Sequence, residues 1–272
     1  GYRFALQNKS VGIVILVGSY YAPLDQPGAH LKVELSPHRL AGAVPQETQQ
    51  RTLDRIAEYF LLKPQATGVA VHLALDVQGW QPPADFLSRM VTRARTIKDH
   101  SGLSSMEFDL SDVAVTYSQG QSYMIGRASS LQAAVYRKDL EMVVSDKVDY
   151  FREQWGASYD PEKPVWRIEM RFHHSVIREI GEGTGQVLTT YAQAAPFIHD
   201  FWAYALKNNR LMYNQRLIDP HWQLFSEDAS FVFPRVGLYV VRKKKETIAA
   251  IQRNLSGALG NMITLWARSG LK

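Results

Sequence analysis

The chain has 272 residues, of which 46% are hydrophobic and 21% charged, a balance that excludes intrinsic disorder for most of its length. The longest purely apolar run, residues 11–18, is far shorter than the roughly 18 residues of a spanning helix, and no secretory signal opens the chain, so we expect a cytoplasmic protein without a membrane partner. Cysteine is absent, which excludes disulfides and thiolate sites, and the net charge of +5 indicates either a polyanionic partner, nucleic acid above all, or a basic soluble enzyme.

The first predicted elements are strands around one helix. Residues 11–21 are apolar and β-branched, and residues 30–35 alternate between apolar and charged side chains, so both segments predict strands. Residues 46–62 predict a helix that ends before Pro64. Residues 68–76 predict another strand, which ends before Gly79.

Pro82 and Pro83 open a predicted helix that extends to about Lys98. Apolar residues at helical spacing, from Phe86 to Ile97, form one face of it. The other face is basic and either is solvated or contacts phosphate. Its basic residues are Arg89, Arg93, Arg95 and Lys98.

The middle of the chain is rich in predicted strands. Residues 108–117 and 121–126 predict a hairpin around residues 118–120. Residues 131–137 and 165–172 predict two further strands, separated by a polar loop. Strands interspersed with a few helices predict an α+β fold up to about residue 180.

The pattern changes from strands to helices at residues 181–185. Residues 186–208 have a helical pattern interrupted at Pro196, and residues 243–268 predict a long helix. We therefore expect a sheet-based domain over residues 1–180 and a helical C-terminal region over residues 181–272. The basic run at the start of the last helix either is solvated or binds phosphate, and it consists of Arg242, Lys243, Lys244 and Lys245.

The strand predicted at residues 165–173 carries the most informative pattern. Because side chains alternate along a strand, one of its faces is apolar and the other is ionisable. The ionisable face consists of Arg167, Glu169, Arg171 and His173. The segment is either an exposed edge strand or the polar floor of an active site.

Two further clusters contain reactive groups. A tyrosine phenol can attack a phosphodiester when a cation stabilises the charge, and Tyr136 is followed by Lys138, which shares its face if the strand continues that far. Glu141 would bring a carboxylate to a divalent metal. His72 and Asp76 lie on one face of their strand with room for a metal between them. In each case a purely structural role is the alternative.

Taken in chain order, these segments resemble the replication initiation factors of rolling-circle plasmids and filamentous phages, a family that also contains relaxases of some conjugative elements. The resemblance covers residues 30–180 and rests on the order and spacing of several motifs. These are His30–Ser36, His72–Asp76, Ser122–Arg127 with Ser129-Ser130, Tyr136-x-Lys138-x-x-Glu141 and Arg167-x-Glu169-x-Arg171. His72 departs from the family pattern, in which an acidic residue is more usual.

The resemblance implies an antiparallel-sheet, relaxase-like domain that nicks one DNA strand at an origin, stays bound through phosphotyrosine and later rejoins the strand. Tyr136 is the matched nucleophile, with Tyr117 and Tyr123 as competitors, and Lys138 and Arg167 act beside it. Mg²⁺ or Mn²⁺ would be held by His72, Asp76, Glu141 and Glu169. The expected DNA contacts are Arg127, Arg171, Arg242, Lys243, Lys244 and Lys245.

The expected partners are single-stranded or hairpin origin DNA and a host helicase. Two other functions stay open: a non-catalytic origin-binding protein of the same fold, and a metal-dependent phosphoesterase that uses Asp76 and Glu169. The first would form no covalent adduct with DNA, and the second would hydrolyse a small ester without an adduct. Plasmid replication, phage replication and transfer of a mobile element share the chemistry, so the sequence does not separate them.

Overall fold

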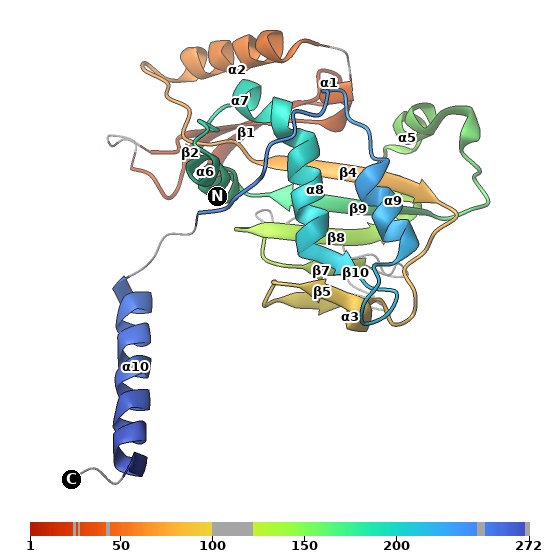
Figure 1. Cartoon of the computed structure of the whole chain (residues 1–272). Helices are drawn as coiled ribbons and strands as arrows, with labels where there is room; N and C mark the ends of the chain where they lie inside the picture. The colour runs from red at the N-terminus through yellow and green to blue at the C-terminus, as the bar shows by residue number, and fades with distance from the viewer. Residues whose placement is uncertain (24–25, 27, 42–43, 100–121, 244–247, 270–272) are drawn as a thin grey trace.

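The computed structural model describes residues 1–23, 26, 28–41, 44–99, 122–243 and 248–269 (Figure 1). A five-stranded antiparallel sheet lies at its centre, in the order β4-β9-β8-β7-β6. Its strands are β4 (Val71–Gln78), β6 (Ile97–Asp99), β7 (Ser122–Ile125), β8 (Leu131–Arg137) and β9 (Val165–Phe172). The charged strand β9 is therefore central, paired on both sides, and not an edge strand.

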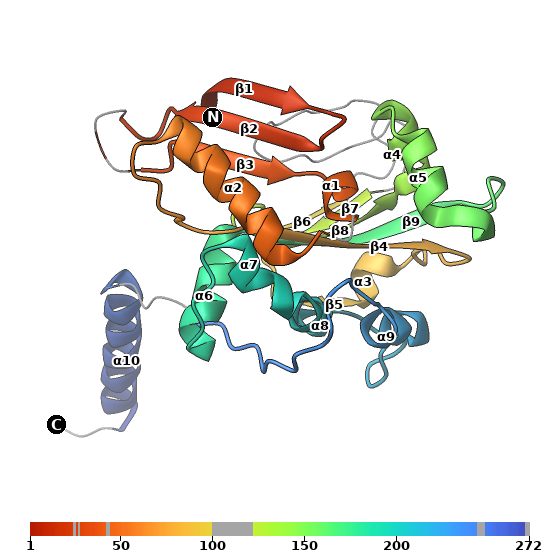
Figure 2. The same cartoon turned by 90° about the horizontal axis from the view of Figure 1, so that it is seen from above.

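Two different layers cover the two faces of this sheet (Figure 2). One layer holds a small antiparallel sheet and four helices: β1 (Tyr2–Asn8), β2 (Ile13–Ser19), β3 (Leu31–Leu35), α1 (Pro37–Ala41), α2 (Gln46–Phe60), α4 (Lys138–Val144) and α5 (Val148–Trp155). The opposite layer holds α6 (His174–Thr184), α8 (Ile198–Asn208) and α9 (Pro220–Glu227). This arrangement confirms the predicted α+β class.

The face covered by α6, α8 and α9 is the apolar face of the sheet. Alternation along β9 places four side chains there, as predicted, and none is more than 4% exposed: Trp166, Ile168, Met170 and Phe172. The helices contribute Ile177 and Phe201 to the same hydrophobic cluster. The main hydrophobic core therefore lies on this side of the sheet, which leaves the other face for polar side chains.

We expect Phe172→Ala to lower the free energy of unfolding by about 3–5 kcal/mol, because its buried ring packs 5.5 Å from that of Phe201. Phe4→Ala is the matched control, since the Phe4 side chain is 66% exposed, and its effect should stay within about 0.5 kcal/mol. Urea denaturation of both variants measures the difference. Equal losses in the two variants would contradict this placement of the core.

The core joins segments on both sides of the predicted change at residues 181–185. The hydrophobic cluster contains Leu73 and Val135 as well as Trp222. The short strands β5 (Met90–Thr92) and β10 (Asn209–Leu211) also pair across that point. The chain as far as α9 thus packs on the central sheet, whereas the last helix, α10 (Ile248–Ser269), lies apart from it in both views (Figures 1 and 2).

The helix predicted from Pro82 to Lys98 is wrong. Only α3 (Phe86–Arg89) is helical, and β5 follows it directly. Met90 pairs with Leu211 of β10, and β-branched residues after it favour a strand. Arg89 lies 2.8 Å from the Asp219 carboxylate, so it is held by the fold and the predicted basic helix face does not form.

Other segments differ in smaller ways. The pattern interrupted at Pro196 forms α7 (Tyr191–Ala194), a 3₁₀ turn (η2, Ala195–Phe197) and α8. The last helix is described from Ile248, residue 243 is not helical, and residues 244–247 lie outside the described residues. The predicted strand 108–117 and its turn lie outside the described residues. α4, α5 and the turn η1 (Gly156–Ser158) occupy the stretch predicted as a polar loop. No helix in the described ranges is both long and apolar enough to cross a membrane.

Candidate active site

The polar face of the central sheet is built by three adjacent strands. On β9 it carries Arg167, Glu169 and Arg171, as predicted from the alternation. The register places Arg167 opposite Asp76 of β4 on one side and opposite Tyr136 of β8 on the other. These side chains therefore leave the sheet on the same face, opposite the apolar one. The layer that contains β1–β3, α4 and α5 lies on that side of the sheet (Figure 2).

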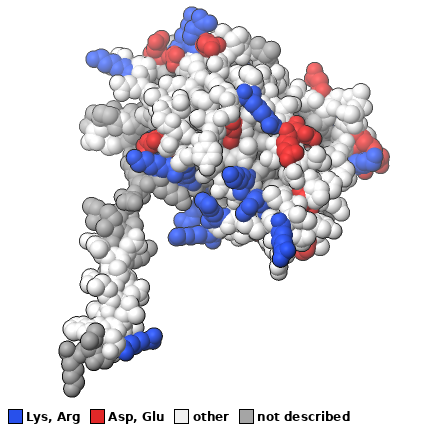
Figure 3. Space-filling model, in the orientation of Figure 1, with Lys and Arg blue, Asp and Glu red and all other residues white. Residues whose placement is uncertain are grey.

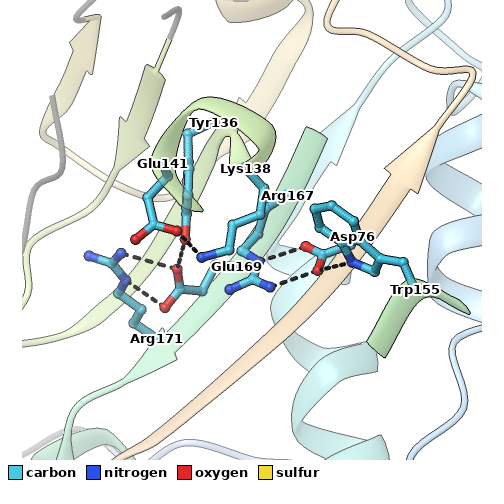
Figure 4. A network of polar contacts seen from close by, with 8 residues as sticks. All are labelled: Asp76, Tyr136, Lys138, Glu141, Trp155, Arg167, Glu169 and Arg171. Carbon is cyan, nitrogen blue, oxygen red and sulfur yellow. Dashed lines mark hydrogen bonds and ion pairs between the residues drawn. The ribbon is translucent and has the colours of Figure 1, made fainter. Parts of the chain in front are cut away.

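Glu169 lies at the centre of this face. Its cross-strand neighbours are Ala74 and Ala134, whose small side chains leave room for the partners of its carboxylate. The Tyr136 hydroxyl donates to Glu169 Oε2 at 3.0 Å (Figure 4). Arg171 donates to both Glu169 oxygens, from Nε at 3.0 Å and from Nη2 at 3.1 Å, which is a bidentate, charge-assisted contact.

Burial and charge set opposite protonation states for Tyr136 and Glu169. Burial would raise the pKa of Glu169, but the cation of Arg171 and the hydrogen bond from His72 outweigh it and hold this pKa well below its usual value. Burial raises the pKa of Tyr136, and the charge of Glu169 raises it further. At neutral pH the carboxylate is therefore ionised and the phenol protonated, with the proton directed at the carboxylate.

The second arginine of the strand forms a parallel pair. Arg167 donates to the two oxygens of Asp76 from Nε at 2.6 Å and from Nη2 at 2.7 Å, and the Trp155 indole donates to the same carboxylate at 3.0 Å. The Phe151 ring lies 5.0 Å from the Arg167 guanidinium carbon and 4.1 Å from the Lys138 ammonium. Helix α5 thus closes one end of the polar face with aromatic side chains.

Lys138 reaches the site from a helix and not from the strand. β8 ends at Arg137, and Lys138 is the first residue of α4, where its ammonium pairs with Glu141 one turn later. Both side chains are buried, and Figure 4 shows them directed to the same side as the Tyr136 hydroxyl. Burial and the charge of Arg167 lower the pKa of Lys138 to about 7, a value suited to proton transfer near neutral pH.

We expect Lys138→Met to lower the free energy of unfolding by about 3–5 kcal/mol, because it leaves the buried Glu141 carboxylate without its cation. The double variant Lys138→Met/Glu141→Leu should recover most of that loss, since it removes both charges. Chemical denaturation of the two single variants and the double variant gives the coupling energy. Losses that simply add would contradict the pairing.

The four predicted metal ligands are not gathered around one point. Asp76 accepts from Arg167, Glu141 pairs with Lys138, and Glu169 accepts from Arg171, while the half-exposed His72 ring lies 3.5 Å from Glu169. Within the described part of the chain, no group of three or more His, Asp or Glu side chains is arranged to hold a metal ion. Carboxylates already bound to guanidinium and ammonium groups do not fit a divalent cation, and the metal requirement stays a prediction.

Of the predicted DNA contacts in the described part of the chain, most lie outside the polar face. Arg127 is exposed just after Gly126, whose φ of +98° and close approach to the Leu131 carbonyl require glycine in that turn. Arg242 pairs with Glu179 of α6, and Lys243 is exposed. Lys244 and Lys245 lie outside the described residues. Of the predicted contacts that the structure describes, only Arg171 belongs to the site.

The structure also separates Tyr136 from Tyr123, one of its two predicted competitors. Tyr123 of β7 pairs with Val135 and points to the apolar face, where its ring lies 4.8 Å from that of Phe86. Tyr117 lies outside the described residues. His173, predicted on the ionisable face of the strand, instead caps α6 by accepting from the Ser175 backbone N–H, because β9 ends at Phe172.

Sequence reasoning missed three residues of this site. Gln132 accepts from Arg171 at 3.3 Å, and its spacing of four residues from Tyr136 on one strand was a usable signal. Phe151 and Trp155 lie on α5, which the spacing of Val148, Phe151 and Trp155 could have indicated. The contacts of Phe151 with Arg167 and of Trp155 with Asp76 depend on the tertiary fold, so the local sequence does not predict them.

Comparison with known proteins finds a phage relative. The chain is 35% identical, over 98% of its own length, to the uncharacterized protein ORF430 of Pseudomonas phage Pf1, and it spans 66% of the length of that protein. No protein-family model and no solved structure matches the chain. The chain is therefore similar to a phage protein, which agrees with the phage part of the predicted resemblance, while the initiator assignment stays a prediction.

Proposed function

We propose that the chain is a DNA strand transferase, which nicks one strand and rejoins it through a phosphotyrosine intermediate at Tyr136. One observation carries the proposal: the Tyr136 hydroxyl donates to Glu169 at 3.0 Å on a sheet face that also holds Arg167 and Arg171. A nucleophile, an acceptor for its proton and two cations for a phosphate are thus side by side. The net charge of +5 and the similarity to a phage protein support a nucleic-acid substrate.

In the proposed step, the Tyr136 oxygen attacks the phosphorus of a phosphodiester. The bond between that oxygen and phosphorus forms, and one bond from phosphorus to a deoxyribose oxygen breaks. The phenolic proton passes to Glu169 as the attack lowers the phenol pKa, and Lys138, with its pKa of about 7, gives a proton to the departing deoxyribose oxygen. Attack by a free DNA hydroxyl on the phosphotyrosine reverses these changes and rejoins the strand.

Arg167 and Arg171 have a distinct role in this proposal. Each guanidinium grips a carboxylate bidentately, and the same planar fork fits two oxygens of a phosphate. We propose that the scissile phosphate takes over some of these hydrogen bonds from Asp76 and Glu169. The two cations then stabilise the charge that builds up on the phosphate during attack.

A second candidate is a non-catalytic DNA-binding protein of the same fold, and the burial of Tyr136 favours it. Its side chain is only 8% exposed, and its hydroxyl is bound to a carboxylate that also pairs with Arg171. Such a network also occurs where ionic groups only stabilise the fold. DNA binding without a covalent product would be the outcome of this second function.

Incubation with single-stranded oligonucleotides from the DNA that surrounds the gene tests the proposal. A protein–DNA adduct that survives denaturing electrophoresis supports strand transfer, and binding without an adduct supports the second candidate. Turnover of a small chromogenic phosphodiester without an adduct would instead support a phosphoesterase. Parallel reactions with Mg²⁺, Mn²⁺ or excess chelator test the metal requirement, which full adduct formation in chelator would contradict.

A further inference from the structure

Helix α10 presents an apolar face that the described structure leaves uncovered. Six large apolar side chains are between 58% and 68% exposed: Leu255, Leu259, Met262, Ile263, Leu265 and Trp266. At the helical turn of 100° per residue they fall on one side, while Gly257, Asn261 and Thr264 fall on the other. The face is too large and too continuous to be scattered surface exposure, so it indicates a partner.

The charged residues around this helix are predominantly basic. Residues 242–272 contain a single acidic residue, Glu246. Their seven basic residues are Arg242, Lys243, Lys244, Lys245, Arg253, Arg268 and Lys272. On the face that Figure 3 shows, the described part of α10 is uncharged except for one basic side chain near its end.

We propose that α10 binds an anionic lipid surface, lying along it with the apolar face inserted and the basic residues at the lipid phosphates. A helix with Trp, Leu and Ile on one face and mostly basic charges beside it is typical of this mode. Three lysines just before this helix, Lys243, Lys244 and Lys245, strengthen attraction to anionic headgroups, whereas the charge of Arg242 is paired with Glu179. The helix lies on the surface and does not cross it, in keeping with the absence of a spanning helix among the described residues.

A second copy of the chain is a poorer partner for this face. The apolar side extends from Leu265 through Leu259 to Ile263, an arc of about 160° at 100° per residue, which is wider than the narrow seam that pairs two helices in a coiled coil. Pairing α10 with itself would also bring segments of like charge together, whereas anionic lipid complements them. For this helix alone, the proposal replaces the expectation that the protein does not contact a membrane. It does not depend on the proposed DNA strand transfer.

Sedimentation of the full chain with vesicles tests the proposal. Vesicles of phosphatidylcholine with phosphatidylglycerol should pellet the chain, vesicles of phosphatidylcholine alone should pellet much less, and added salt should weaken binding. Leu259→Glu/Trp266→Glu should reduce partition into the anionic vesicles by about tenfold or more, because it puts two charges into the apolar face. The control Asn261→Glu/Thr264→Glu adds the same charge on the polar face and should bind much better than the apolar-face variant.

Three results would overturn the proposal. In the first, the wild-type chain stays in the supernatant with anionic vesicles. In the second, both double variants lose binding to the same extent, which would show that the added negative charge, and not the apolar face, determines binding. A wild-type dimer that Leu259→Glu/Trp266→Glu dissociates, without vesicle binding, would identify a second copy as the partner. Circular dichroism and urea denaturation of the variants show whether the rest of the fold is intact.

Discussion

Tyr136→Phe is expected to abolish the covalent DNA adduct and to reduce nicking by about 10³-fold or more, because it removes the only atom that forms the bond to phosphorus. The ring stays in place between its neighbours on β8, so the fold is retained. Loss of the hydrogen bond to Glu169 should cost about 1 kcal/mol of stability. Adduct yield on denaturing gels, with DNA affinity measured in parallel, separates lost chemistry from lost binding.

Tyr123→Phe is the matched control for this experiment. Tyr123 lies on the neighbouring strand β7 but points into the apolar core, so its hydroxyl should not affect adduct formation. An adduct of normal yield in Tyr136→Phe would show that Tyr136 is not the nucleophile. Loss of the adduct in both variants would show that the reaction depends on the sheet as a whole and not on one hydroxyl.

Glu169→Gln is expected to lower the free energy of unfolding by about 3 kcal/mol or more at neutral pH, and to abolish adduct formation as well. The variant removes the carboxylate charge that Arg171 contacts through two hydrogen bonds, and it removes the proton acceptor of Tyr136. Glu153→Gln on α5 is the control, because that side chain is exposed and should change stability by less than about 0.5 kcal/mol. Urea denaturation of the three proteins gives the comparison.

The pH dependence of the Glu169→Gln effect has a definite sign. The pKa of Glu169 in the folded chain lies well below the ordinary value of 4.5. Its contribution to stability is therefore fully present above about pH 4.5 and is lost as the pH falls through the folded pKa. The stability difference between wild type and Glu169→Gln should stay constant near neutral pH and shrink in acid. A difference that grows in acid would contradict the assigned pKa direction.

The strands of the site were predictable because their signals are local. The alternation of apolar and ionisable residues defines β9 and its two faces, and the apolar run before Arg137 defines β8. The partners of the charged side chains were not predictable, because they depend on the order of strands in the sheet. The sequence around Asp76 and Arg167 contains no signal that β4 and β9 are neighbours. Because the two strands pair, Asp76, which was predicted as a metal ligand, instead accepts hydrogen bonds from Arg167.

Two local errors have physical causes of the same kind. Residues 90–92 follow a helical pattern in sequence, but pairing with β10, more than 100 residues later, holds them in a strand. Lys138 was placed on the face of Tyr136 by extending the strand, whereas the chain turns into α4 at that residue. The Lys138 ammonium still reaches the polar face. The prediction that Lys138 lies near the Tyr136 phenol is therefore correct, although the strand on which it was based ends one residue earlier.

Mass spectrometry of the covalent adduct tests the central claim most directly. After digestion of DNA and protein, trypsin releases residues 128–137 as a peptide whose single tyrosine is Tyr136, whereas Tyr117 and Tyr123 share the peptide 99–127. The account predicts a nucleotide phosphate on Tyr136 in the peptide 128–137 and an unmodified peptide 99–127. A nucleotide on any other tyrosine, or DNA binding with no modified peptide at all, would contradict it.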